Sequence, residues 1–117
     1  MFKKTLVIAL LIVCHDLYGA GHGRSVAAVP SRIDNIGSQG FLIRGQFGNP
    51  GTCTTSDSIF ISNGHAQFDR LYSTVLAAFM AAKKIQIYVH SCVEIPWLSG
   101  SSADYNQLTG GDLIITN

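Results

Sequence analysis

Histidine, serine and carboxylate side chains are the groups of this chain that could support acid–base or nucleophilic chemistry. His90 ends an alternating apolar run and His65 precedes a helical pattern, so a strand residue and a turn or capping residue are expected there. Glu94 is the only glutamate, so a paired-carboxylate glycosidase would need aspartate partners that the sequence does not place. No nucleophile elbow, phosphate loop or metalloprotease motif occurs. We therefore expect a protein that is not an enzyme and uses no cofactor.

Aromatic side chains beside hydroxyl and amide groups indicate a different chemistry, the binding of a polar ligand. Tyr88 falls on the outward face of an alternating run, and Trp97 and Tyr105 fall in the long polar segment 96–111. An aromatic ring stacks on a sugar while hydroxyls and amides bond its polar edge. The sequence predicts a ligand site at these residues. The alternative reading is that Trp97 only covers one end of the fold.

Two cysteines, Cys53 and Cys92, predict a single disulfide. The loop that this bond would close is long enough for chain entropy to contribute roughly 4 kcal/mol of stability. The alternative is a metal site, because His90 and Cys92 would share one face of a strand. Zinc requires three or four ligands and no convincing others are present, so we expect no metal.

The first twenty residues have the pattern of a secretory signal peptide. A short basic stretch at 2–4 precedes an apolar run at 5–13, which is too short to span a bilayer. We expect cleavage after Ala20, leaving one domain at 21–117 that is secreted or periplasmic and has no membrane span. Two alternatives are a lipid anchor at Cys14 and an uncleaved anchor helix.

Length and composition restrict the number of domains and the class of protein. The chain has 117 residues, which allows one domain. Apolar residues make up 47% of it and charged residues 13%, which excludes a disordered chain. The net charge of +1 argues against nucleic acid as a partner, because binding to phosphates requires a basic surface. A domain this small has a marginal core, so a stabilising cross-link is expected.

One helix and five strands are expected to position these residues. Apolar residues from Phe68 to Phe79 recur at helical spacing, Asp69 lies in the first turn and Lys83 and Lys84 follow the last, which predicts a helix over 66–82. The first strand is expected in two short runs, 25–29 and 32–36, which Pro30 interrupts, and the other four at 40–47, 58–62, 85–90 and 112–116. The order β-β-β-α-β-β is that of an OB-fold-like five-stranded barrel. A helix on one face of an open antiparallel sheet is the alternative fold.

The stretch 68–90 resembles the helix and following strand of B subunits of the subtilase-cytotoxin and pertussis-like AB5 toxins. The shared residues are Phe68, Leu71, Tyr72 and Leu76 in the helix, and Ile85, Ile87 and Tyr88 after a short polar break. The leading signal-like segment, the cysteine before the third strand and Pro96-Trp97 extend the likeness. The chain also resembles small exported bacterial proteins, many of which have no assigned function.

The resemblance implies an OB-fold protomer in a ring of five, a cell-surface glycan as ligand and a toxin A subunit as partner. It also implies site residues. Toxin B subunits place a serine at the start of the first strand, which Ser25 matches, and a sugar-binding tyrosine on the fourth strand. Tyr88 lies beside the aligned position, which is Val89 here, and Leu42 stands where those subunits have a cysteine.

Three functional hypotheses follow. The first is an exported, non-enzymatic binding module that recognises glycan. The second is an exported accessory or structural domain with no small-molecule ligand, which binds another protein through a strand edge. The third is a small secreted hydrolase, which requires a histidine within hydrogen-bond reach of a serine or aspartate in a cleft.

Overall fold

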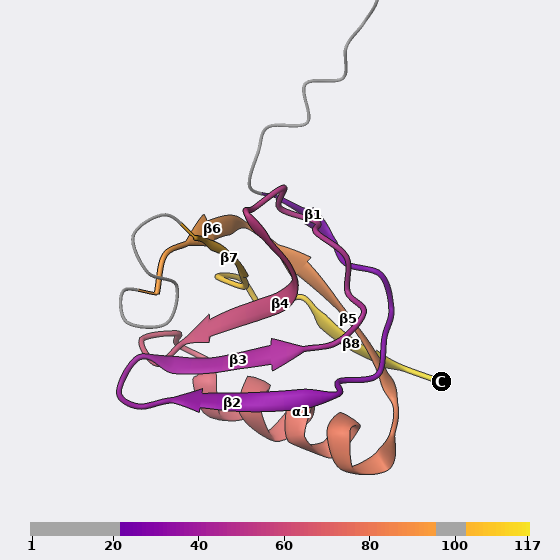
Figure 1. Ribbon diagram of the computed structural model, residues 1–117. Helices are drawn as coiled ribbons and strands as arrows, with labels where there is room; N and C mark the ends of the chain where they lie inside the picture. The colour runs from indigo at the N-terminus through magenta and orange to yellow at the C-terminus, as the bar shows by residue number, and fades with distance from the viewer. Residues whose placement is uncertain (1–21, 96–102) are drawn as a thin grey trace, which may run out of the picture.

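The computed structural model describes residues 22–95 and 103–117, which fold mostly as β-structure with one helix (Figure 1). This coarse prediction is confirmed. The predicted signal segment and Trp97 lie outside the described residues. The elements in chain order are β1 (Gly23–Arg24), β2 (Arg32–Ile36), β3 (Gly40–Arg44), β4 (Thr55–Ser62), α1 (Phe68–Ala81), β5 (Lys84–Val89), β6 (Ser91–Val93), β7 (Tyr105–Gln107) and β8 (Leu113–Thr116).

The larger sheet has five strands in the order β2-β3-β4-β7-β6. The first three strands form an antiparallel meander, and Gly37 adopts a φ of 47° in the turn between β2 and β3. β7 then pairs parallel to β4, with an irregular register between Thr55 and Ile59, and antiparallel to β6. The apolar residues of β3 and β4 are buried on both faces of this sheet: Phe41, Ile43, Ile59 and Ile61 belong to the main core, and Leu42 and Phe60 to a second cluster. A shift of one residue would exchange the two sets of side chains.

The smaller sheet has the order β1-β5-β8, with β5 at its centre. The inward residues of β5, Ile85, Ile87 and Val89, are fully buried, and the residues between them are less buried. This is the alternation that the sequence predicts. The strand order leaves β8 at one edge of the sheet, paired only on the side of β5.

The expected OB-fold-like barrel is not what the described strands form, because neither sheet closes on itself. β2 and β6 remain the two edges of the larger sheet, while β8 pairs with β5 in the smaller sheet. The segment 25–31 joins the sheets along one side through separate hydrogen bonds. Ala28 N donates to Ile85 O at 3.0 Å, and Ser31 N donates to Arg44 O at 2.8 Å. These bonds hold the sheets together without a continuous ladder between them.

Two local predictions are corrected by the structure. The expected strand 25–29 is irregular apart from a bridge between Ala28 and Ile85, since Pro30 has no N–H to continue a ladder. The segment 96–111, expected to be a surface loop, contains β7, and β6 also went unpredicted. Both are three-residue strands, too short for a pattern of alternation to be recognised.

Helix α1 lies below β2 and β3 in Figure 1 and closes one side of the main core. It begins at Phe68 and ends at Ala81, slightly inside the predicted range. Its buried residues are Leu71, Val75 and Ala78, which pack with the inward apolar side chains of β3, β4 and β5. Phe41 on β3 makes edge-on ring contacts with Phe68 and Tyr72 at 5.4 and 5.0 Å. The helical stripe therefore faces the sheet in part, because Leu76 and Phe79 at its edge are 40% and 38% exposed.

The predicted disulfide between Cys53 and Cys92 is present, and it ties the loop before β4 to β6. Asp104 lies close enough for its carboxylate and the two sulfurs to fall within 4.8 Å of one another. The sulfurs are bonded to each other and offer no thiolate to a metal ion. Within the described ranges, no helix is long and apolar enough to cross a membrane.

Candidate functional site

Ser25, which the resemblance offered as a ligand residue, is used inside the fold. It is 3% exposed. Its hydroxyl accepts a hydrogen bond from Ile87 N at 2.9 Å and donates one to Val26 O at 3.0 Å. Its own N–H donates to Ile87 O at 2.7 Å. The side chain therefore fastens the start of the segment 25–31 to β5, and its only donor is already paired.

Tyr88 lies half-buried on the outward face of the smaller sheet, beside two cationic or ionisable neighbours. The Arg24 guanidinium carbon is 6.0 Å from the ring centroid, and the His90 ring meets it edge-on at 4.8 Å. Arg24 is the cross-strand partner of Tyr88. The ring thus contacts Arg24 of the neighbouring strand β1 and His90, the residue that follows β5.

Tyr105 lies in the second apolar cluster, on the opposite side of the larger sheet from the main core. It is 7% exposed and packs with Leu42, Phe60 and Ile95. The ring therefore acts as a core residue. Tyr88 and Tyr105 belong to different sheets, and Trp97 lies outside the described residues, so the described part of the chain does not bring the expected aromatic residues together.

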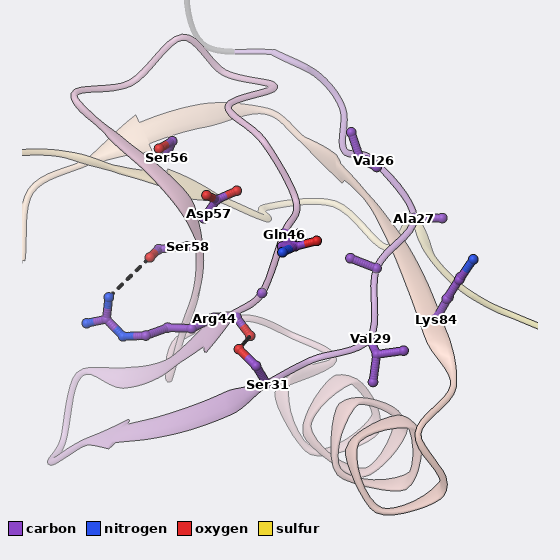
Figure 2. Close-up of a pocket in the computed structure, with 12 residues that line it drawn as sticks. Val26, Ala27, Val29, Ser31, Arg44, Gln46, Ser56, Asp57, Ser58 and Lys84 are labelled. Atoms are coloured by element: carbon purple, nitrogen blue, oxygen red, sulfur yellow. Dashed lines mark hydrogen bonds between the residues drawn. The ribbon is translucent and has the colours of Figure 1, made fainter.

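The structure instead forms a cleft of about 740 Å³ at the side where the segment 25–31 joins the two sheets (Figure 2). Residues 26–29 and Ser31 line one side, residues 56–58 line the other, and residues 44–46 run between them, with Lys84 near one end. The side chains that give the cleft its polar character are those of Ser31, Arg44, Gln46, Ser56, Asp57, Ser58 and Lys84.

Close backbone approaches shape this cleft. A Cβ atom on Gly45 would lie 2.8 Å from the Phe47 ring and 3.1 Å from Val29 O, so only glycine lets the chain pass there undisturbed. Asp57 adopts a φ of 58°, and its carboxylate accepts a hydrogen bond from Gly48 N at 2.8 Å. Aspartate tolerates this backbone region because its short side chain can bond locally.

Arg44 is held in place by two neighbours at the cleft wall. Its Nε donates to Asp34 at 2.7 Å and its Nη1 donates to Ser58 Oγ at 3.3 Å, as Figure 2 shows for Ser58. Arg32 donates to the other oxygen of Asp34. Partial burial raises the pKa of Asp34, but the hydrogen bonds from Arg44 and Arg32 outweigh it and hold the pKa below 3.8. Two guanidinium groups thus share one ionised carboxylate, which leaves this cluster with a net positive charge.

The arrangement offers many donors and acceptors to a polar molecule, but no nucleophile paired with a base. No histidine lines the cleft. His65 is occupied elsewhere: its Nδ1 accepts from Gln67 N at 2.9 Å, and its Nε2 bonds to Gly110 O at 2.7 Å. Of the two roles that the sequence predicts, turn or cap, the structure shows the turn, because α1 has no side-chain cap hydrogen bond. Within residues 22–95 and 103–117, no histidine side chain bonds to a serine hydroxyl or a carboxylate.

Sequence reasoning missed the cleft because its residues come from four separate parts of the chain: the irregular segment 26–31, the end of β3 with the bend after it, the first half of β4 and the start of β5. The polar run 54–58 and the glycines at 45 and 48 mark a bend in the chain, and in retrospect they are the available indication. Which segments lie opposite them depends on hydrogen bonds between residues far apart in the sequence, such as that from Val26 N to Phe47 O at 3.1 Å.

Comparison of the chain with protein-family models, with curated proteins and with solved structures found no match.

Proposed function

We propose that this protein is an exported, non-enzymatic module that binds a glycan in the cleft between residues 26–31 and 56–58. The observation that carries the proposal is the composition of the cleft: the Ser31 and Ser56 hydroxyls, the Gln46 amide and the Arg44 guanidinium line one open space. Ser58, which is 2% exposed, holds the guanidinium in place. Sugar hydroxyls both donate and accept hydrogen bonds, and a mixed set of such groups matches them. Val26 is 62% exposed at the same cleft and offers an apolar surface to the less polar face of a sugar ring.

Two further features support an exported binding role over a hydrolytic one. The disulfide is of the kind that forms in oxidising compartments, in agreement with the predicted signal peptide. The serines of the cleft lack a histidine that would act as general base. A ring of five and a toxin A subunit are what the resemblance implies, and no observation among the described residues supports either of them.

The test is a glycan array with the purified, oxidised protein, followed by calorimetric titration of any glycan that binds. Gln46→Ala and Ser56→Ala remove exposed cleft groups and are expected to weaken binding at least tenfold, with unfolding midpoints unchanged. Thr109→Ala, an exposed residue that does not line the cleft, is the matched control. Tyr88→Ala distinguishes the two candidate surfaces, because a loss of binding in that variant alone would transfer the site to the outward face of β5. Absence of glycan binding would contradict the proposal.

The alternative function is an exported accessory domain that binds another protein. The observation that favours it is the edge strand β8, where Ile114 and Ile115 are both partly exposed. Under this alternative, substitutions in the cleft would have no effect on function, whereas substitutions on β8 would abolish it.

A further inference from the structure

The backbone of β8 presents unused hydrogen-bonding groups along one side. Tyr88 N donates to Asp112 O at 3.0 Å, and the register pairs Gln86 with Ile114, so the even-numbered residues of this strand bond to β5. In an antiparallel ladder the residues between them direct N–H and C=O to the opposite side. Leu113 N donates to Gly111 O, but the ladder leaves Ile115 N–H and Leu113 C=O facing outward among the described residues.

No side chain of β8 opposes pairing with another strand. The strand reads Leu-Ile-Ile-Thr, without a charge or a proline. Ile114 is 47% exposed and Ile115 is 44% exposed, on opposite faces of the sheet. Exposed edges in proteins usually carry lysine, proline or a bulge that prevents such pairing. An uncharged, β-branched edge of this kind is suited to strand addition.

We propose that β8 pairs antiparallel with β8 of a second copy of this chain, about a two-fold axis at Ile114. This register places Leu113 opposite Ile115 of the second copy. Ile115 N–H then donates to Leu113 C=O of the other chain, and symmetry repeats the bond. Each β8 edge thus supplies an N–H donor at Ile115 and a C=O acceptor at Leu113, and each of these groups bonds to its counterpart in the other copy.

The charges at the two ends of β8 favour antiparallel pairing with a second copy of the chain. Asp112 lies at the start of β8, whereas Lys84 pairs with Thr116 at its end and Lys83 Nζ donates to Asn117 Oδ1 at 3.3 Å. Antiparallel pairing brings the acidic end of each strand to the basic end of the other. Parallel pairing would bring like charges together. The result is one continuous sheet through both copies that covers Ile114 and Ile115.

The first measurement is light scattering of the purified, oxidised protein over a dilution series, where twice the chain mass is expected. Ile114→Glu and Ile114→Lys each place two like charges directly opposite one another across the axis. Each variant is expected to weaken association roughly tenfold or more. Mixing the two variants pairs opposite charges and is expected to restore the dimer. Ser38→Glu, an exposed substitution in the turn between β2 and β3 of the other sheet, is the control and should remain dimeric.

Ile115→Pro provides a second variant, because it removes the outward N–H without breaking a bond to β5. It is expected to weaken association while the circular dichroism spectrum is retained. A monomer at all concentrations, a fivefold mass, or a series of larger species would each overturn the proposal. A dimer that both the Ile114 and the Ile115 variants leave intact would overturn it as well.

Discussion

At the scale of single residues, Asp34 and Asn106 each join separate segments of the chain through side-chain hydrogen bonds that the local sequence does not predict. Asp34 joins β2 to β3 by accepting bonds from Arg32 and Arg44, and so fixes the guanidinium at the cleft. Asn106 is fully buried and holds the loop before β4: its Oδ1 accepts from Gly51 N at 2.7 Å and its Nδ2 donates to Asn49 Oδ1 at 3.1 Å. The partners of Asn106 lie 55 and 57 residues away in sequence, whereas those of Asp34 lie 2 and 10 residues away.

Asp34 gives stability an acid dependence. Because its pKa in the folded protein lies below 3.8, the folded state binds fewer protons than the unfolded state. The stabilisation is complete above the unfolded pKa and is lost as pH falls through the folded one. We expect urea unfolding between about pH 6 and about pH 2.5 to show a smaller loss in Asp34→Asn than in the wild type. Lys83→Gln, which bonds to no carboxylate, should keep the wild-type response; an equal loss in Asp34→Asn would contradict the assignment.

Loss of the Asn106 side-chain amide is expected to lower the stability of the folded protein. Asn106→Ala leaves Gly51 N–H without an acceptor in a buried position, and such a group costs about 1–3 kcal/mol. Chemical denaturation should show a destabilisation of that order. The control is Gln39→Ala, a partly exposed residue with no side-chain bond among those described, which should change stability by less than about 0.5 kcal/mol. Equal effects of the two substitutions would show that the amide network is not required.

At the scale of elements, the end of α1 carries an avoidable strain. Ala82 has φ 53° and ψ 42°, the left-handed conformation that ends many helices, and its N–H bonds back to the last turn. Glycine is the usual residue there because it lacks the Cβ atom that this conformation crowds. The same element shows how a strong helical period fixes a helix in place even where the capping residue is not optimal.

Ala82→Gly is therefore expected to stabilise the protein by about 0.5–1 kcal/mol. Ala77→Gly, in the exposed interior of the same helix, should destabilise it by about 1 kcal/mol because helical φ and ψ restrict glycine the most. Thermal unfolding of the pair measures the difference directly. Destabilisation by both substitutions would mean that the left-handed end does not persist in solution.

At the scale of the whole molecule, the two sheets are held together by the segment 25–31 and one shared core, and the disulfide cross-links the loop before β4 to β6 within the larger sheet. The bond between Cys53 and Cys92 spans 39 residues of sequence, including β4 and the whole of α1. Closing a loop of this length in the unfolded chain contributes roughly 4 kcal/mol. For a domain of this size that is a large share of a total stability of about 5–15 kcal/mol.

Replacing both cysteines by alanine is expected to lower the free energy of unfolding by roughly 2–4 kcal/mol, and reduction of the wild type should have a similar effect. Guanidinium denaturation with and without reductant provides the measurement. The double variant is its own control, since reductant should leave it unchanged. A wild type that is equally stable when reduced would show that the disulfide does not contribute to the stability of the fold.

The sequence by itself determined the local elements that carry a strong period. Helix α1 and strand β5 were predictable because their apolar residues repeat at 3.6 and 2 residues, and the disulfide because only two cysteines follow the leader-like segment. The short strands β6 and β7 could not be predicted, since three residues such as Tyr105-Asn106-Gln107 carry no period.

Only the tertiary structure decided the arrangement of the sheets and the position of the candidate site. Ser25 and Tyr105 were plausible ligand residues by type, but long-range hydrogen bonding and packing bury both. The cleft exists because Val26 N reaches Phe47 O and Ser31 N reaches Arg44 O, which brings distant segments alongside one another. Periodicity records which face of an element is buried, but not which other element buries it, so the pairing of segments was settled by contacts between residues far apart in the chain.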